Sequence, residues 1–209
     1  MKVTRYTQSC LLIEEGRARI LIDPSGEDKD TALKLENIDA VFYTHEHSDH
    51  FDPELAKTFV EEGIAPVYAN ASTAAKIEAS KTVVEDGKEY DISGVKIKAI
   101  ELPHCLMPNG SQGPQNTGYL IHGKLFHPGD GKELDGLLVD TVALPITGPD
   151  VSMKDCFMFA KQLAAKTVIP IHYDKIGANP EVYATFAGYF PEFTFKFQVL
   201  AKGRSAEIK

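Results

Sequence analysis

Short apolar runs separated by turn residues fill the first fifty positions of the chain. The runs at 11–13 and 18–22 flank a Glu-Gly pair, and this pattern predicts a β-hairpin. Residues 1–6 predict a strand before the hairpin, and the apolar run at 38–43 predicts another strand after it. That last strand leads directly into a stretch rich in histidine, so rigid backbone would support the side chains that follow.

Helix signals appear farther along the chain. An Asp-Pro pair supplies an N-cap and a proline that is tolerated in the first turn, which predicts a helix over 53–62. Residues 72–80 predict a second helix, and a Ser-Met-Lys-Asp capping box opens a third helix over 152–165. The tail from residue 180 onward is expected to add a helix and one or two strands.

The middle of the chain again predicts β-structure. Residues 81–101 predict a β-meander, because apolar and lysine side chains alternate along its last strand. Residues 117–127 predict a second hairpin. Like the first hairpin it is followed by an aspartate, Asp130 against Asp23, which indicates a weak internal repeat and two similar half-folds. Two further buried strands are predicted at 141–146 and 167–171.

The composition fits one soluble globular domain over residues 1–209, since 43% of the residues are hydrophobic and 25% are charged. The formal net charge of -8 argues against binding nucleic acid or an anionic membrane by charge alone. It does not argue against an anionic substrate, because a bound metal reverses the sign locally. No apolar run approaches the length of a membrane span. The expected partner is a small-molecule substrate, and a homo-oligomer stays open.

The cysteines predict no disulfide framework, because they are odd in number and form no CxxC pair. The default location is therefore the cytoplasm. Cys10 and Cys156 stand in apolar surroundings and are interpreted as small core residues. Cys105 directly follows His104, and for this cysteine a structural role and a place at the site both stay open.

The densest chemistry lies in the stretch from Thr44 to His50, which holds three histidines and two acids. Imidazole and carboxylate ligands together suit zinc and its first-row neighbours. One short loop can hardly point four groups at a single ion, so the spacing favours two ions. His45 and His47, two apart on extended chain, would share one ion. Asp49 and His50, at the turn into the next helix, would bind the other.

Three more ligand-type residues stand where predicted strands end: His104, Asp130 and His172. If these strand ends gather at one edge of a stack of sheets, all the ligand-type residues form one site. One ion would then be held by His45, His47 and His104, and the other by Asp49, His50 and His172, with Asp130 bridging. Gly129 and Gly131 would let the backbone approach the metals closely.

The motif HxHxDH at 45–50 resembles that of the metallo-β-lactamase-fold hydrolases. The later ligands of that family match at His104, at Asp130 within His-Pro-Gly-Asp, and at His172 within Ile-Pro-Ile-His-Tyr. The resemblance covers nearly the whole chain, in order. It implies an α+β four-layer αββα sandwich with a metal site at the edge of its two sheets. The short length and the Val-Ile-Pro-Ile-His-Tyr segment are most similar to the branch of UlaG-like lactonases and small hydrolases.

The chain also departs from members of this superfamily. The UlaG-like branch often has a histidine at the place of Gln8, so the role of that histidine is not carried over. His104 stands in Leu-Pro-His-Cys, not in the Thr-Pro-Gly-His setting of glyoxalase II-like thioesterases, which disfavours a thioesterase. Diiron flavoprotein relatives usually carry Glu in place of His47, which disfavours a redox diiron site. The chain is too short for the inserted domain of RNA-processing relatives.

The resemblance implies a metal-dependent hydrolase with two divalent ions, zinc first and manganese as the alternative. A hydroxide bridging the ions would be the nucleophile. The ions outweigh the charges of Asp49, Asp130 and the hydroxide, so the expected substrate is a small, anionic phosphodiester, lactone or related ester. Asp49 is expected to accept a proton as well as to bind metal. Two alternatives stay open: an iron-containing oxidoreductase or sulfur-transfer relative of the same fold, and a non-catalytic metal-binding protein.

Residues 105–116 predict a mobile loop, because they are rich in Pro, Gly, Asn and Gln. Such loops often close over sites. Candidates for binding substrate or protonating the leaving group are four side chains of this loop and one tyrosine: Asn109, Ser111, Gln112, Asn116 and Tyr173. His122, next to a hairpin glycine, is expected to be exposed, and His127 is expected to be structural.

Overall fold

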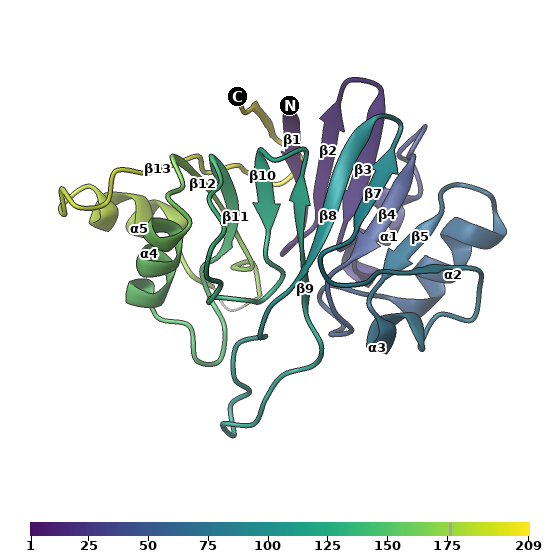
Figure 1. Cartoon of the computed structure of the whole chain (residues 1–209), viewed down its shortest axis with the longest axis horizontal. Helices are drawn as coiled ribbons and strands as arrows, with labels where there is room; N and C mark the ends of the chain where they lie inside the picture. Colours follow the sequence, from purple (N-terminus) through teal and green to yellow (C-terminus); the bar gives the residue numbers. More distant parts are fainter. Residues whose placement is uncertain (176) are drawn as a thin grey trace.

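Two seven-stranded mixed sheets pack face to face, and helices cover their outer faces (Figure 1). This is the four-layer αββα sandwich expected from the sequence. The computed structural model describes residues 1–175 and 177–209. Within these residues no helix combines the length and the apolar character needed to cross a bilayer.

The strands of the first sheet are β1 (Lys2–Arg5), β2 (Leu11–Glu15), β3 (Ala18–Ile22), β4 (Ala40–Tyr43), β5 (Val67–Ala69), β6 (Thr82–Val83) and β14 (Ser205–Glu207). The strands of the second sheet are β7 (Glu89–Ile92), β8 (Val95–Glu101), β9 (Thr117–Ile121), β10 (Leu125–His127), β11 (Thr141–Pro145), β12 (Thr167–Ile171) and β13 (Lys196–Phe197). The helices are the 3-10 turn Gly26–Asp28, α1 (Lys29–Ala32), α2 (Pro53–Glu61), α3 (Ala71–Ala74), α4 (Met153–Gln162) and α5 (Pro180–Ala187).

The two sheets repeat one topology. The first sheet has the order β14-β1-β2-β3-β4-β5-β6, antiparallel from β14 to β3 and parallel from β3 to β6. The second sheet has the order β7-β8-β9-β10-β11-β12-β13, antiparallel from β7 to β10 and parallel from β10 to β13. The β2–β3 hairpin thus corresponds to the β9–β10 hairpin, which confirms the internal repeat.

Alternating side chains of the strands divide the apolar core into three clusters. Leu11 of β2 belongs to the cluster between the sheets, together with Ile97 of β8. Leu12 points the other way and joins Phe59 of α2 in the cluster outside the first sheet. The matching cluster outside the second sheet combines strand residues such as Val142 with the apolar side of α4. Each sheet is therefore held on both faces.

Two predictions for the segment after β5 were wrong. The helix expected over 72–80 is only the four-residue α3, which Asn70 caps by accepting a hydrogen bond from the Thr73 N–H. Ile77 beyond it is buried in the cluster around α2, so tertiary packing and not propensity ends this helix. The expected meander over 81–101 is also split. β6 joins the first sheet parallel to β5, and only β7 and β8 form a hairpin in the second sheet.

Candidate metal centre

The ligand-type residues follow the carboxyl ends of four strands. β8 and β10 are both antiparallel to β9, and β10 to β12 are parallel, so β8, β10 and β12 end at the same edge of the second sheet. The residues that follow these ends are His104, Asp130 and His172. The loop after β4 in the first sheet brings its four side chains to the same place.

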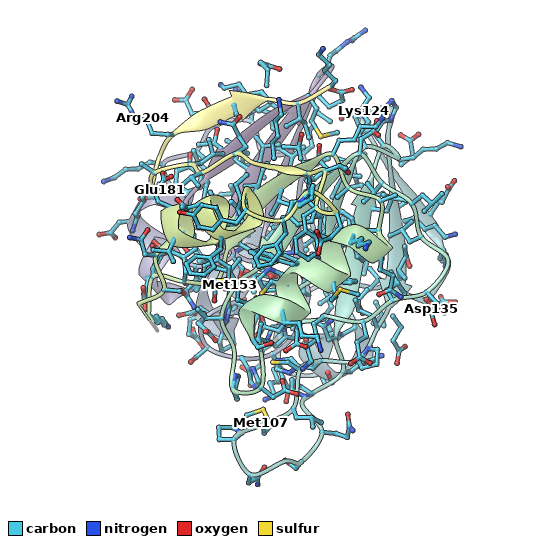
Figure 2. All side chains as sticks on the ribbon, turned by 90° about the vertical axis from the view of Figure 1, so that its left-hand side faces the viewer. Met107, Lys124, Asp135, Met153, Glu181 and Arg204 are labelled. Atoms are coloured by element: carbon cyan, nitrogen blue, oxygen red, sulfur yellow. The ribbon has the colours of Figure 1, made fainter. Side chains whose placement is uncertain are left out.

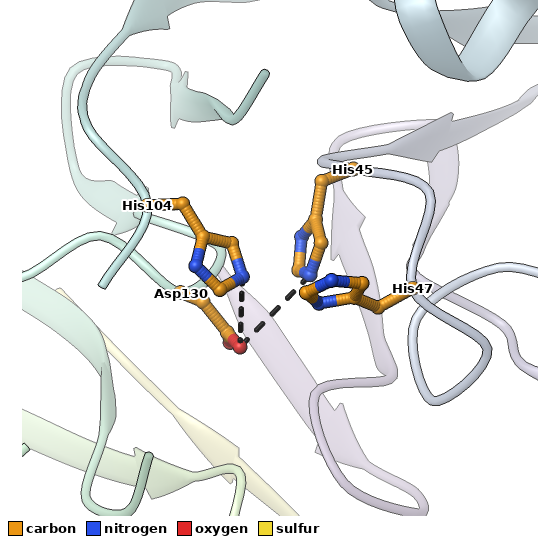
Figure 3. A group of neighbouring side chains, drawn as sticks. All are labelled: His45, His47, His104 and Asp130. Carbon is orange, nitrogen blue, oxygen red and sulfur yellow. Dashed lines mark ion pairs between the residues drawn. The ribbon is translucent and has the colours of Figure 1, made fainter. Parts of the chain in front are cut away.

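The structure gathers all seven residues into two groups, and the ligand atoms within each group lie within 4.8 Å of one another. The first group is His45, His47, His104 and Asp130, and the second is Asp49, His50 and His172. Figure 3 shows the side chains of the first group pointing toward one another, with His45 and His47 from one loop and His104 and Asp130 from two other segments. The division matches the one expected from the spacing of the motif.

Asp130 lies between the two groups. Its Oδ2 atom is 3.9 Å from His45 Nε2, 3.5 Å from His104 Nε2 and 3.3 Å from His172 Nε2. Its Oδ1 atom is 3.1 Å from His50 Nε2. One carboxylate therefore faces histidines of both groups, as expected of a residue that bridges two ions.

Each of the four buried histidines among the ligand-type residues is fixed through its Nδ1 atom, so that its Nε2 atom faces the centre. The Nδ1 atom of His45 contacts Thr44 Oγ1 at 3.0 Å, and that of His50 contacts Asp23 Oδ2 at 2.8 Å. The Nδ1 atom of His104 contacts the Cys105 carbonyl at 2.6 Å, and that of His172 contacts the Thr147 carbonyl at 2.9 Å. Carbonyl and carboxylate oxygens only accept, and the Thr44 hydroxyl already donates to Asp23, so each Nδ1 carries the proton. In the neutral form of each ring, the Nε2 lone pair then faces the centre and can bind a metal.

The donor set fits two divalent ions. The Nε2 atoms of His45, His50, His104 and His172 and Asp130 Oδ1 are buried and have no hydrogen-bond partner among the described residues. An unpaired buried polar atom costs about 1–3 kcal/mol, so five together point to a bound group. Zinc binds nitrogen at about 2.0–2.1 Å, which puts neighbouring tetrahedral ligand atoms about 3.3 Å apart. The contacts of Asp130 with His50, His104 and His172 lie near this value.

Opposite charges stabilise the cluster in the metal-free protein. Burial lowers the pKa of His45 well below its usual value. Burial also opposes the charged form of His50, but Asp130 and Asp23 outweigh it and hold the pKa of His50 well above its usual range. Against burial, the nearby Asp130 carboxylate and the Cys105 carbonyl raise the pKa of His104 to about 10. A metal ion must therefore displace protons from His50 and His104.

Asp23 supports the centre without belonging to either group, and the sequence indicated it only as the counterpart of Asp130 in the first hairpin. It is fully buried. Its Oδ1 atom accepts from the Thr44 N–H at 2.8 Å, and its Oδ2 atom accepts from the Thr44 hydroxyl at 2.7 Å and from His50. Through these contacts Asp23 orients His50 directly and His45 through Thr44.

Asn116, a candidate for binding substrate, instead forms hydrogen bonds with the turn that carries Asp130. It is buried, its Nδ2 donates to the Pro128 carbonyl at 2.9 Å, and its Oδ1 accepts from the Asp130 N–H at 3.3 Å. Gly129 has a φ of +60°, and an added Cβ would lie 2.2 Å from Asn116 Oδ1. The glycine therefore makes room for Asn116 beside the turn that carries Asp130.

Three other candidates for binding substrate make contacts away from the centre: Tyr173, Asn109 and Ser111. The Tyr173 hydroxyl donates to the Leu200 carbonyl at 3.3 Å, and its ring lies 4.1 Å from Arg5 Cζ. Asn109 Oδ1 accepts from the N–H and the hydroxyl of Ser111 near the tip of the loop. Figure 2 shows this loop, marked by Met107, projecting from the body of the molecule. Gln112 is exposed and lines two cavities beside His104, of about 310 and 450 Å³.

The remaining histidines and cysteines have the places expected for them. His127 is buried, donates from Nε2 to the Ser9 carbonyl at 2.9 Å and accepts from the Gly129 N–H, so it is structural. His122 is exposed. Cys10 and Cys156 are buried in the apolar clusters. The Cys105 side chain is buried too, and its backbone serves the centre, since its N–H donates to the Asp130 carbonyl at 3.0 Å.

Gln8, which stands where the UlaG-like branch often has a histidine, is a further residue of the centre, although the sequence did not indicate a role for it. Its side-chain amide donates to Asp49 Oδ2 at 3.2 Å. The His172 Nε2 atom lies 3.3 Å from the same oxygen. Although burial favours the neutral carboxyl of Asp49, the nearby His172 ring and the charge of His50 lower its pKa.

A family model described as the β-lactamase superfamily domain matches residues 2–172, which include all seven ligand-type residues. The protein Rv0786c of Mycobacterium tuberculosis is 28% identical over 207 residues, which are 96% of each chain. A UPF0173 metal-dependent hydrolase of Pelotomaculum thermopropionicum is 30% identical over 230 residues, with 100% of each chain covered.

Solved structures share the fold. Igni18, a metallo hydrolase of Ignicoccus hospitalis, superposes with a TM-score of 0.75 at 20% identity, covering 100% of this chain and 99% of its own. The metallo-β-lactamase fold protein YhfI of Bacillus subtilis superposes with a TM-score of 0.77 at 15% identity, covering 98% of both chains. At these identities the likeness concerns the arrangement of the sheets and helices alone.

Proposed function

Because the chain belongs to the metallo-β-lactamase superfamily, as a UPF0173 metal-dependent hydrolase, we propose that it uses two divalent ions to hydrolyse a phosphodiester, lactone or related ester. Zinc is the proposed metal, and the proposed substrate is small and anionic. The observation that carries this proposal is the set of buried, unpartnered Nε2 and Oδ1 atoms that converge on the centre.

The seven residues divide the work of holding the ions. His45, His47 and His104 would hold one ion, Asp49, His50 and His172 the other, and Asp130 would contact both. Two bound ions supply an acidified water as nucleophile and a Lewis acid for the substrate oxygen. The histidines are well suited to this task, because the hydrogen bonds at Nδ1 already fix four of the rings in the orientation that metal binding needs.

Asp49 is the proposed proton acceptor. Its side chain is 21% exposed, whereas that of Asp130 is 6% exposed, so water and substrate reach Asp49 more easily. Asp49 is ionised at neutral pH and can accept a proton, although its lowered pKa makes it a weak base. The greater exposure of its side chain therefore favours Asp49 over Asp130 as the group that moves a proton to the leaving group.

The cavity beside His104 offers a place for the group that leaves. Its volume is about 310 Å³, and Leu106 and Lys132 are among its lining residues. The Lys132 ammonium lies 2.9 Å from Asp150 Oδ2 and is the cation of this wall. Asp150 and Glu133 line the same cavity and offset the charge of this lysine, so the ions would be the main attraction for a substrate anion.

An activity panel tests the proposal. Metal-depleted protein is reloaded with zinc or manganese and assayed on bis-p-nitrophenyl phosphate and on simple lactones. We expect hydrolysis of at least one ester class, and His50→Ala is expected to reduce it to background because that variant lacks one ligand. Activity that survives His50→Ala would contradict the two-ion mechanism.

Metal analysis of the same samples separates the alternatives. Iron with a coloured, redox-active centre would favour an oxidoreductase of this fold. Protein that binds its metals in full but hydrolyses no ester of the panel would favour a non-catalytic metal-binding protein.

A further inference from the structure

Gln8 connects the two sheets at the edge that carries the metal centre. Its backbone N–H donates to Asp174 Oδ2 at 2.6 Å, and its carbonyl accepts from the His172 N–H at 3.0 Å. Its side chain donates from Nε2 to Asp49 Oδ2 at 3.2 Å and accepts at Oε1 from the Lys175 N–H at 3.1 Å. One residue of the β1–β2 connection therefore touches a ligand after β4 and a ligand after β12.

The backbone at this point is held in an unusual conformation. Gln8 has a φ of +52° and is fully buried, and His172, to which it is bonded, has a φ of +59°. Residues other than glycine seldom adopt this left-handed region, and they persist there only where their surroundings hold them. The surrounding fold therefore fixes the backbone conformation of both Gln8 and His172.

A buried arginine keeps the frame around Gln8 rigid. The Arg5 guanidinium is 1% exposed, pairs with Asp174 and stacks over the Tyr173 ring. Asp174 in turn accepts from the Gln8 N–H. The segment that follows His172 is therefore anchored to β1 on the side of the molecule where the side chain of Gln8 enters the centre.

We propose that Gln8 is a positioning residue for the second ion, the ion of Asp49, His50 and His172. This inference rests on the proposed two-ion function. The amide is suited to the place because its ends have opposite roles: the NH₂ must face the Asp49 carboxylate, and the oxygen must face the Lys175 N–H. An apolar side chain meets neither demand. Gln8 thereby fixes the carboxylate of Asp49 beside His172, whereas the ion of His45, His47 and His104 does not depend on it.

The test variant is Gln8→Met, which keeps the length of the side chain and removes both hydrogen bonds. Metal-free protein is titrated with Co²⁺, followed by its visible absorption, and with Zn²⁺ by calorimetry. The variant His50→Ala shows which binding step belongs to the second ion. We expect Gln8→Met to weaken that step by about 10–100-fold, the usual effect of removing a group that orients a ligand, and to leave the other step unchanged.

Two further variants separate the hydrogen bond from packing. Gln8→His offers an N–H to Asp49 on a residue that tolerates the left-handed backbone, so it is expected to recover part of the lost affinity. Gln162→Met is the matched control, because Gln162 is exposed and donates from Nε2 to Asp135 Oδ1 at 2.6 Å, away from the centre. In this control, the affinity for each of the two ions should equal that of the wild type. If Gln8→Met does not fold, Gln8→Asn replaces it, since the shorter amide is drawn back from Asp49.

Three results would overturn the inference. Wild-type affinity for both ions in Gln8→Met would show that Gln8 does not act on Asp49. Equal weakening of both ions, together with a lower melting temperature of the metal-free variant, would assign Gln8 a structural role only. A wild-type protein that binds a single ion would refute the two-ion function itself, and the inference with it. The last result is measured on the wild type alone, so a failure of the two-ion function can be distinguished from a failure of the inference about Gln8.

Discussion

At the scale of single residues, the centre depends on side chains that fix its ligands as much as on the ligands themselves. Asp23, Asn116 and Gln8 each use both ends of a short polar group to hold a ligand or the turn that carries it. A substitution at these positions that exchanges a donor for an acceptor would therefore lose at least one of these hydrogen bonds.

The substitution Asp23→Asn is expected to weaken metal binding. Three donors point at the two oxygens of Asp23, and an asparagine must turn its NH₂ toward at least one of them. His50 or Thr44 then loses its support. We expect the affinity for the second ion to fall by about 10–100-fold, measured by competition with a chelator. An unchanged affinity would show that His50 is held by the rest of the fold.

The substitution Gly129→Ala is expected to destabilise the protein by about 3 kcal/mol or more, the sum of a left-handed backbone and overpacking. The new Cβ would meet Asn116 Oδ1 at 2.2 Å and Thr44 Cβ at 2.9 Å. Gly123→Ala is the matched control, since its φ is +68° but no described heavy atom lies within 4 Å of its added Cβ. Urea unfolding should show a clearly larger loss for Gly129→Ala, and equal losses would contradict the packing argument.

At the scale of elements, the direction of the strands decides where the ligands meet. β8, β10 and β12 end at one edge because of their pairing, although a long stretch of sequence separates each from the next. The helices carry none of the seven ligand-type residues. They cover the outer faces, and their own ends are secured by local signals such as the Asp52 and Ser152 caps.

The capping box of α4 offers a test at this scale. Ser152 accepts from the Asp155 N–H, and Asp155 accepts from the Ser152 N–H at 2.9 Å. Ser152→Ala is expected to cost about 1 kcal/mol, or about 2–4 °C in melting temperature for a protein of this size. Metal content should stay that of the wild type, because α4 carries no ligand. The exposed Ser205→Ala in β14 serves as the control. A drop in metal content would show that the helix shapes the centre after all.

At the scale of the whole molecule, the metal ions are expected to join the two sheets. The seven ligand-type residues come from both sheets, so ions bound by them would add a link that the unfolded chain lacks.

Removal of the metal is therefore expected to lower the melting temperature. A ligand at a concentration 100 times its Kd stabilises a protein by about 2.7 kcal/mol, which corresponds to about 5–10 °C here. The measurement compares protein with excess zinc and protein treated with a chelator, and renewed zinc should restore the higher value. Equal melting temperatures would mean that the ions contribute nothing to the folded state.

The affinity for metal is expected to rise with pH. In the metal-free protein the pKa of His104 is about 10 and that of His50 lies well above its usual value, so both are protonated below those values and at neutral pH. Only the neutral imidazole binds metal, and each displaced proton changes the affinity by roughly tenfold per pH unit. Calorimetry in buffers of different ionisation enthalpy should detect the released protons. Heat that does not depend on the buffer would contradict the prediction.

The sequence by itself determined most of the elements and the set of ligand-type residues. Apolar runs and turn residues predicted both hairpins, Asp52 and Ser152 predicted the starts of two helices, and the seven ligand-type residues stood at strand ends where the structure gathers them. These signals are local, since caps, turns and alternating burial act over a few residues. The spacing of the motif also indicated how the residues would divide between two ions.

Only the tertiary structure decided what surrounds those residues. The place of β6, the length of α3 and the roles of Asp23, Asn116 and Gln8 depend on contacts between segments far apart in the chain. Gln8 and Asp49 are 41 positions apart. No local pattern announces a hydrogen bond of that kind, because it forms only when both sheets have met. The ligand-type residues could therefore be predicted from the sequence, while the groups that orient them could be identified only in the folded structure.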